Sequence, residues 1–173
     1  MVAILVVVLA WTAKTPLSQL QNASKCVLLS FQQACEDRGV PYWACFGTLL
    51  GAVRDHDIIQ WDDDIDVGMK KADFLSLKPH LEKYGLEIVT RIPFMGNTLS
   101  GQQYVKLVLD QAISSKLGVG DQTSRLCCSV DVFLFEYSTD GAKVTNPLIS
   151  FAVQDVLTET RELSLGTVNP RVL

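Results

Sequence analysis

The stretch that decides the fold is Trp61-Asp62-Asp63-Asp64-Ile65-Asp66-Val67-Gly68, where four carboxylates fall within five residues. Charges this close repel one another, and the large apolar residues among them are unusual for a solvated loop. In an extended segment alternate side chains share a face, so Asp64 and Asp66 point one way while Ile65 and Val67 point into a core. Two same-facing carboxylates at the end of a strand suit a divalent cation such as Mg²⁺ or Mn²⁺.

Two other metal-binding patterns can be tested against the acidic run. An EF-hand loop beginning at Asp62 needs Gly at its sixth position and Glu at its twelfth, where the chain has Val67 and Asp73, so the EF-hand fails. The DxD loop of glycosyltransferases, which binds Mn²⁺ and nucleotide-sugar phosphates, needs only three residues. Either 62–64 or 64–66 satisfies that pattern. A DxD glycosyltransferase therefore stays open as an alternative function.

The segments on both sides of the acidic run carry features of a phosphate site. Upstream, a predicted strand turns at Gly47 into a helix, and Thr48 places a hydroxyl and an N–H at the helix start, which favours anions. Downstream, Asp131 is a single acid in an apolar strand, where it needs a partner such as a metal ion. A strand, Gly-Thr, a helix, Asp-x-Asp and a later strand acid resemble the layout of nucleotidyltransferase-fold enzymes.

The hydrophobic pattern of the rest of the chain predicts one domain of mixed type. Apolar periodicity places helices at 16–38, 48–53 and 72–84, and strands at 42–46, 64–69, 86–92, 103–109 and 130–135. Pro79 is awkward inside the third helix and is expected to split it. We therefore predict an α/β (α+β) fold, a nucleotidyltransferase-like mixed sheet with flanking helices.

Composition and the N-terminus set further bounds. The 173 residues suffice for one domain, and 15 basic against 19 acidic residues without a basic run argue against a nucleic-acid partner. Residues 1–13 carry no charge and are too few to span a bilayer, which takes ~20. They fit a signal peptide or a membrane-anchor remnant, with a buried strand as the alternative. Residues 14–173 would form the domain.

The match to known sequences is closer than fold level. The strings Tyr42-Trp43-Ala44-Cys45-Phe46-Gly47-Thr48-Leu49-Leu50-Gly51-Ala52-Val53-Arg54 and Ile58-Ile59-Gln60-Trp61-Asp62-Asp63-Asp64-Ile65-Asp66-Val67-Gly68-Met69 resemble the LicD/fukutin family. Ser129-Val130-Asp131-Val132-Phe133 resembles the family's later acidic strand. The resemblance implies a metal-dependent phosphotransferase. It would move phosphocholine or ribitol phosphate from a CDP-activated donor to a glycan or glycoprotein acceptor. It also implies a place in the secretory pathway, at the Golgi lumen or membrane.

The resemblance also assigns roles to individual residues. Three carboxylates would be catalytic and would bind Mg²⁺ or Mn²⁺: Asp64, Asp66 and Asp131. Substrate binding would fall to Gly47, Thr48, Arg54, Asp62, Asp63 and Lys106. Asp131 would be the general base if a protein base is used. The alternatives are a surface ion pair for Arg54 and a solvent-exposed side chain for Lys106.

The end of the chain carries one more expectation. The family pattern continues past Pro170, whereas this chain stops at Leu173, so we expect a domain truncated at its C-terminus, on the acceptor side. Such a chain would bind the metal and CDP weakly and turn over little. A non-catalytic remnant that only binds a partner is the alternative of another class.

Overall fold

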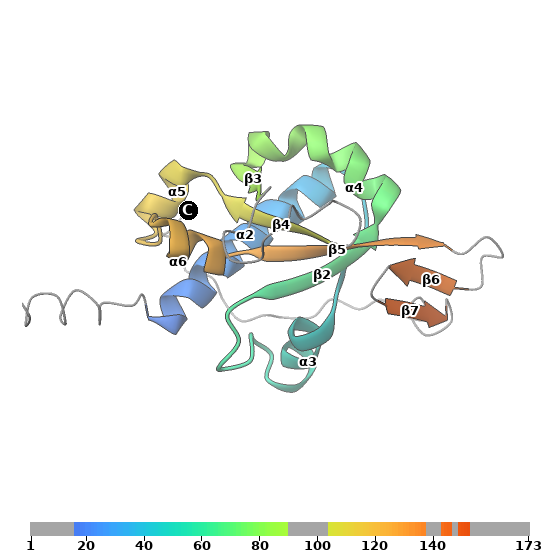
Figure 1. The fold of residues 1–173 in the computed structure, drawn as a ribbon, viewed down its shortest axis with the longest axis horizontal. Helices are drawn as coiled ribbons and strands as arrows, with labels where there is room; N and C mark the ends of the chain where they lie inside the picture. Colours follow the sequence, from blue (N-terminus) through green and yellow to red (C-terminus); the bar gives the residue numbers. More distant parts are fainter. Residues whose placement is uncertain (1–15, 90–103, 138–142, 147–148, 153–173) are drawn as a thin grey trace, which may run out of the picture.

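The computed structural model describes residues 16–89, 104–137, 143–146 and 149–152 (Figure 1). The predictions for residues 1–13 and for the end of the chain after Ala152 lie outside these ranges. Within them, no helix combines the length and the apolar character that crossing a membrane requires.

The first described helix, α2 (Leu17–Arg38), follows the predicted pattern. It begins after Pro16 and ends at Gly39, whose φ of 64° is left-handed and costs glycine little. Its apolar stripe is fully buried, with Val27 and Phe31 at 0 % exposure. This stripe packs on the sheet and makes α2 the longest element of the core.

The sheet is mixed, as the sequence predicts. Its strands run in the order β1 (Trp43–Ala44), β2 (Ile65–Lys70), β5 (Val130–Tyr137), β4 (Tyr104–Leu109) and β3 (Leu86–Ile88). The central pair, β2 and β5, is parallel, and the other neighbours are antiparallel. Two strands that the sequence did not predict, β6 (Lys143–Asn146) and β7 (Ile149–Ala152), continue antiparallel from the end of β5.

One face of the sheet is covered by helices and the other carries the acidic residues. The buried side chains of β2 and β5, such as Val67 and Val132, pack against α2, α4 (Lys71–Leu77) and the 3₁₀ helix η1 (Lys78–Tyr84). The predicted helix over 72–84 thus splits at Pro79, at the start of η1. Helix α3 (Phe46–Arg54) lies on the other side of β2 from α4 (Figure 1).

Two short helices, α5 (Gln111–Lys116) and α6 (Gln122–Cys127), were not predicted. Each begins at an aspartate that accepts a backbone hydrogen bond: Asp110 from the N–H of Ile113 at 2.8 Å, and Asp121 from the N–H of Ser124 at 3.0 Å. These capping signals are present in the sequence. Six-residue helices, however, are too short to show hydrophobic periodicity.

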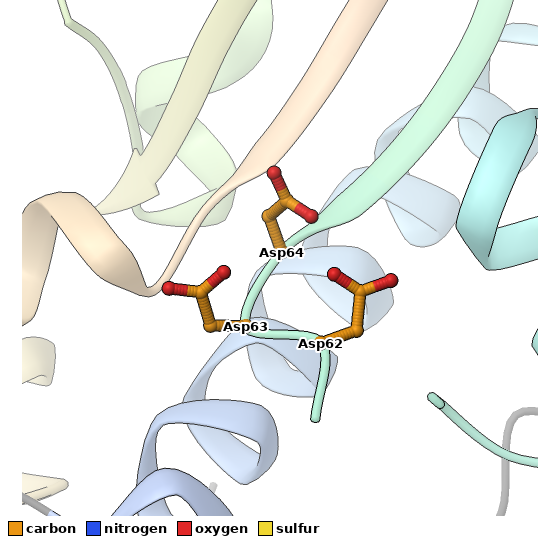
Figure 2. Close-up of side chains that lie close together, drawn as sticks. All are labelled: Asp62, Asp63 and Asp64. Carbon is orange, nitrogen blue, oxygen red and sulfur yellow. The ribbon is translucent and has the colours of Figure 1, made fainter. Parts of the chain in front are cut away.

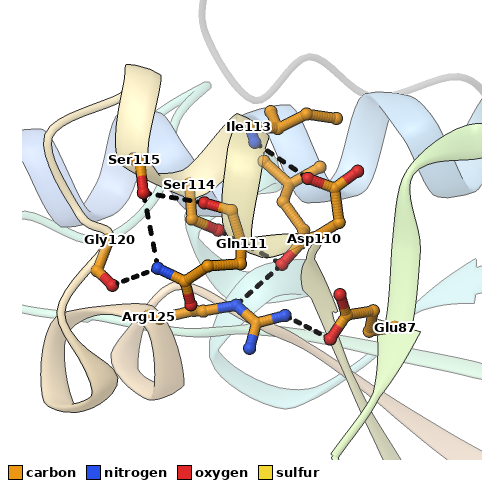
Figure 3. A network of polar contacts seen from close by, with 9 residues as sticks. Glu87, Asp110, Gln111, Ile113, Ser114, Ser115, Gly120 and Arg125 are labelled. Carbon is orange, nitrogen blue, oxygen red and sulfur yellow. Dashed lines mark hydrogen bonds and ion pairs between the residues drawn. The ribbon is translucent and has the colours of Figure 1, made fainter.

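A polar network fastens these helices to the edge of the sheet (Figure 3). Arg125 of α6 donates to the carbonyl of Leu109 at 2.9 Å and pairs with Glu87 of β3 at 2.5 Å. Gln111 of α5 donates to the carbonyl of Gly120 at 2.5 Å. The network thus ties α6, the element that precedes β5 in the chain, to β3 and to the end of β4.

Candidate active site

Three carboxylates converge where β2 and β5 begin. Asp64 directly precedes β2, while Asp66 and Asp131 are paired across the two parallel strands. Paired residues share a face of the sheet, and this is the face opposite the helix-covered core. One oxygen from each of the three carboxylates lies within 4.8 Å of the others. We call Asp64, Asp66 and Asp131 the carboxylate triad.

A second group of carboxylates shares one member with the triad. Asp62, Asp63 and Asp64 also place one oxygen each within 4.8 Å of one another (Figure 2). Asp63 is exposed, whereas Asp62 and Asp64 are half-buried. Both groups offer only carboxylate oxygens, the hard ligands that Mg²⁺ and Mn²⁺ prefer. The donor chemistry therefore fits the predicted metal, with Asp64 common to both groups.

Without a cation the triad is electrostatically costly. Burial, followed by repulsion from Asp64 and Asp131, raises the pKa of Asp66 to about 7. Burial and then the charge of Asp131 raise the pKa of Asp64 to about 6. Both shifts disfavour the ionised form, and a bound cation would remove that penalty.

These shifts predict a pH-dependent stability of the metal-free protein. The pKa values of Asp64 and Asp66, at about 6 and about 7, exceed that of an unfolded aspartate, about 3.9. The folded state therefore binds protons that the unfolded chain does not. We expect the free energy of unfolding to rise as the pH falls from about 8 to about 5. Urea denaturation in EDTA measures this, and stability that instead rises with pH over this range would contradict it.

Lys106 is largely buried and pairs with Asp131, which corrects one of the two predicted roles. The alternative of a solvent-exposed lysine is wrong, because its side chain is only 12 % exposed. Its ammonium pairs with Oδ1 of Asp131 at 2.7 Å and donates to the hydroxyl of Ser129 at 2.7 Å. The pKa of Asp131 is still raised, since burial outweighs the opposing effects of Lys106 and Ser129. Ser129 was not among the predicted site residues.

The start of α3 is tied to β2 through one side-chain and one backbone hydrogen bond. The N–H of Asp66 donates to the hydroxyl of Thr48 at 2.7 Å, and the N–H of Cys45 donates to the carbonyl of Asp66 at 3.0 Å. A Cβ at Gly47 would lie 2.6 Å from a carboxylate oxygen of Asp62. Gly47 and Thr48 thus lie beside the carboxylates, and Gly47 leaves the space that the Asp62 side chain fills.

Arg54 does not join these residues. It lies at the other end of α3, where it forms an exposed ion pair with Asp55 at 2.6 Å. This is the surface ion pair that was predicted as the alternative role of Arg54.

An aromatic cluster adjoins the triad and was missed by the sequence analysis. The ring of Phe133 stacks on Tyr104 with centroids 5.3 Å apart, and Phe46 meets Phe133 edge-on at 4.9 Å. Phe133 follows Asp131 by two residues, and Tyr104 precedes Lys106 by two, so these rings share the face of the triad. Phe46 is 42 % exposed and has a φ of 45°, a strained value for a bulky residue.

Comparison with known proteins finds several partly matching relatives. A 52-residue segment is 42 % identical to an uncharacterised protein of Rickettsia prowazekii, covering 28 % of this chain and 20 % of that protein. The human protein named ribitol 5-phosphate transferase FKRP is 41 % identical over 59 residues, covering 34 % of this chain and 11 % of the relative. The lipopolysaccharide cholinephosphotransferase LicD of Haemophilus influenzae is 38 % identical over 61 residues, covering 35 % of this chain and 23 % of the relative.

The matched segments therefore span between about a tenth and a quarter of these relatives' lengths. A family profile covers far more of this chain, from residue 39 to residue 147, and includes the carboxylate triad, Gly47, Thr48 and Lys106. The mixed sheet, the converging aspartates and this match together show that the chain belongs to the family described as LicD/FKTN/FKRP, nucleotidyltransferase domain.

Proposed function

We propose that the protein is a metal-dependent phosphotransferase that moves a phospho-alcohol from a CDP-activated donor to a glycan or glycoprotein acceptor. The observation that carries the proposal is the carboxylate triad, with three oxygens within 4.8 Å of one another on the face of the sheet opposite the helix-covered core, in a chain of this family. The relatives named as transferases of ribitol 5-phosphate and of phosphocholine support the reaction class and leave the alcohol open.

The triad would hold the cation. Asp64, Asp66 and Asp131 are its proposed ligands, and Asp62 and Asp63 could complete a second position through the shared Asp64. A bound Mg²⁺ or Mn²⁺ would neutralise donor phosphate charge and favour ionisation of the acceptor hydroxyl. The protein's own part is to hold these oxygens at the start of β2 and β5, two strands whose apolar side chains are buried in the core.

Asp131 has a second proposed role, as the acceptor of a proton. Lys106 and Ser129 both contact its Oδ1, and among the described residues no hydrogen bond or ion pair reaches Oδ2. Oδ2 is therefore available to a cation or to an acceptor hydroxyl. The ammonium of Lys106 lies within reach of the same space and could also meet a donor phosphate.

The aromatic cluster of Phe46, Phe133 and Tyr104 supports a nucleotide as the donor. A nucleotide joins a charged phosphate to a flat base, and here metal-binding carboxylates adjoin exposed aromatic surface on one face. Base-on-aromatic stacking contributes about 1–3 kcal/mol per base in single-stranded nucleic-acid binding. We assign the cytosine of the donor to this cluster.

Replacing Phe46 with Ala tests that assignment. We expect CDP to bind about tenfold more weakly in the presence of Mn²⁺, because a stacking contact of about 1–3 kcal/mol is lost. The affinity for Mn²⁺ alone should stay unchanged, since Phe46 supplies no ligand atom. Titration calorimetry measures both, and Leu50→Ala, an exposed residue further along α3, is the matched control. Equal CDP affinity in the two variants would contradict the assignment.

The experiment for the function itself compares CDP and UDP binding with and without Mn²⁺. We expect CDP to bind only when the cation is present and more tightly than UDP. Tighter binding of UDP would favour the DxD glycosyltransferase, and no cation-dependent binding of either would favour the non-catalytic remnant. Incubation with CDP-ribitol or CDP-choline and a panel of glycans then identifies the group transferred. A place in the secretory pathway, at the Golgi, remains part of the proposal.

A further inference from the structure

The loop that carries the acidic run, residues 57–64, is held by polar side chains of α2. We call it the acidic loop. The side-chain amide of Gln21 donates to two carbonyls of the loop, that of Ile59 at 3.1 Å and that of Asp62 at 2.8 Å. One turn of helix further on, the hydroxyl of Ser24 lies 3.5 Å from the carbonyl of Asp63. Positions three apart share one side of a helix, so both side chains face the loop.

An ion pair between a buried lysine and a partly exposed aspartate adds to this attachment. Lys25 of α2 pairs with Asp57 at the start of the loop, and its side chain is only 9 % exposed. Asp57 also accepts the N–H of Ile58 at 2.7 Å through the same oxygen, Oδ1. A lysine buried to this degree requires a partner, and here the partner belongs to the acidic loop rather than to the core.

Helix α3 confines the loop from a second direction. A Cβ at Gly51 would lie 2.5 Å from the carbonyl of Asp57 and 3.1 Å from the N–H nitrogen of Ile59. The backbone of the loop is therefore pressed against α3, and it is hydrogen-bonded to α2. Its turn is closed by the N–H of Asp62, which donates to the carbonyl of Ile59 at 2.9 Å.

This restraint opposes the repulsion among the carboxylates of the loop. Asp62, Asp63 and Asp64 are consecutive and repel one another, and a free loop would relax by spreading their carboxylates apart. Gln21 opposes this without adding charge, because a neutral amide supplies both of its N–H groups to carbonyls on the two sides of the turn. The two carbonyls belong to Ile59 and Asp62, the residues that open and close this turn, and the turn ends two residues before the proposed ligand Asp64.

We propose that Gln21 of α2, aided by Ser24 and Lys25, is a positioning residue that presets the acidic loop for cation binding. The inference rests on the proposed function for its metal. It assigns this part of the site to residues that precede residue 39, where the family profile begins. Residues behind the direct ligands of a metal site commonly change its affinity by 10–100-fold.

The chain offers a matched control for the test. Gln19, on the same helix, also donates its side-chain amide to a backbone carbonyl, that of Leu117 at 2.9 Å, away from the acidic loop. Gln21→Met and Gln19→Met each keep side-chain length and remove the donor. Gln21→Asn, which keeps the amide but shortens its reach, serves if Gln21→Met does not fold.

Two measurements are made on each variant. In EDTA, hydrogen–deuterium exchange by mass spectrometry follows the amides of residues 57–64. We expect faster exchange there in Gln21→Met than in Gln19→Met at matched global stability. Water-proton relaxation then measures Mn²⁺ binding, for which we expect an affinity about tenfold weaker in Gln21→Met and unchanged in Gln19→Met.

The outcomes separate this inference from the proposed function. Loop exchange or Mn²⁺ affinity that is the same in both variants overturns the positioning role, even if wild type binds Mn²⁺ well. A wild type that binds no Mn²⁺ instead overturns the metal-dependent function. In that case the exchange measurement alone decides whether Gln21 holds the loop.

Discussion

The Asp64→Asn variant is expected to lose Mn²⁺-dependent CDP binding while its metal-free form unfolds at a higher temperature than wild type. Asp64 belongs to both carboxylate groups, so its removal leaves neither with three charged ligands. In the metal-free protein the same change deletes a charge whose pKa is raised to about 6 by burial and repulsion. Thermal unfolding in EDTA and calorimetry with Mn²⁺ and CDP measure the two effects.

Glu82→Gln provides the control for Asp64→Asn, because Glu82 is an exposed carboxylate of η1 with no place in the site. We expect this variant to match wild type in both measurements. An Asp64→Asn protein that is less stable without metal yet still binds CDP in an Mn²⁺-dependent way would show that Asp64 serves the fold instead.

The second large effect is expected from Gly51→Ala. Its new Cβ would come within 2.5 Å of the Asp57 carbonyl, which is backbone and cannot turn away as a side chain could. Relief requires that α3 and the acidic loop separate, so we expect a loss of about 3 kcal/mol in the free energy of unfolding. Because the same loop carries the carboxylates, Mn²⁺ affinity should fall as well. Urea denaturation and Mn²⁺ titration measure these changes.

Two variants of the same helix serve as comparisons for Gly51→Ala. Leu50→Ala alters an exposed neighbour and should leave both quantities close to wild type. Gly47→Ala would crowd only the end of the Asp62 side chain, which can rotate, so it should change cation binding more than stability. A Gly51→Ala protein as stable as Leu50→Ala would mean that the loop accommodates the methyl group without moving.

Local pattern determined much of this protein. The alternation of Asp64 and Asp66 with Ile65 and Val67 predicted which side chains would share a face, because a strand repeats every two residues. Helix α2 and its stop at Gly39 followed from the same kind of short-range geometry. The meeting of Asp131 with the acidic run was also expected, although only through the resemblance to a family and the need of a buried acid for a partner.

Tertiary structure decided what depends on contacts between distant segments. Lys106 and Asp131 meet because β4 and β5 pair in one particular register. The alternating pattern of each strand predicts which face these side chains share, but not which residue of the other strand each lies opposite. Gln21 reaches the acidic loop because the fold places α2 beside that loop. Its two hydrogen-bond partners, Ile59 and Asp62, lie 38 and 41 residues further along the sequence. Phe46 was predicted to end a strand but begins α3 with a strained backbone, where its ring packs on Phe133. The positions of the acidic side chains therefore follow from local sequence, whereas their partners and supports come from strand register and helix packing.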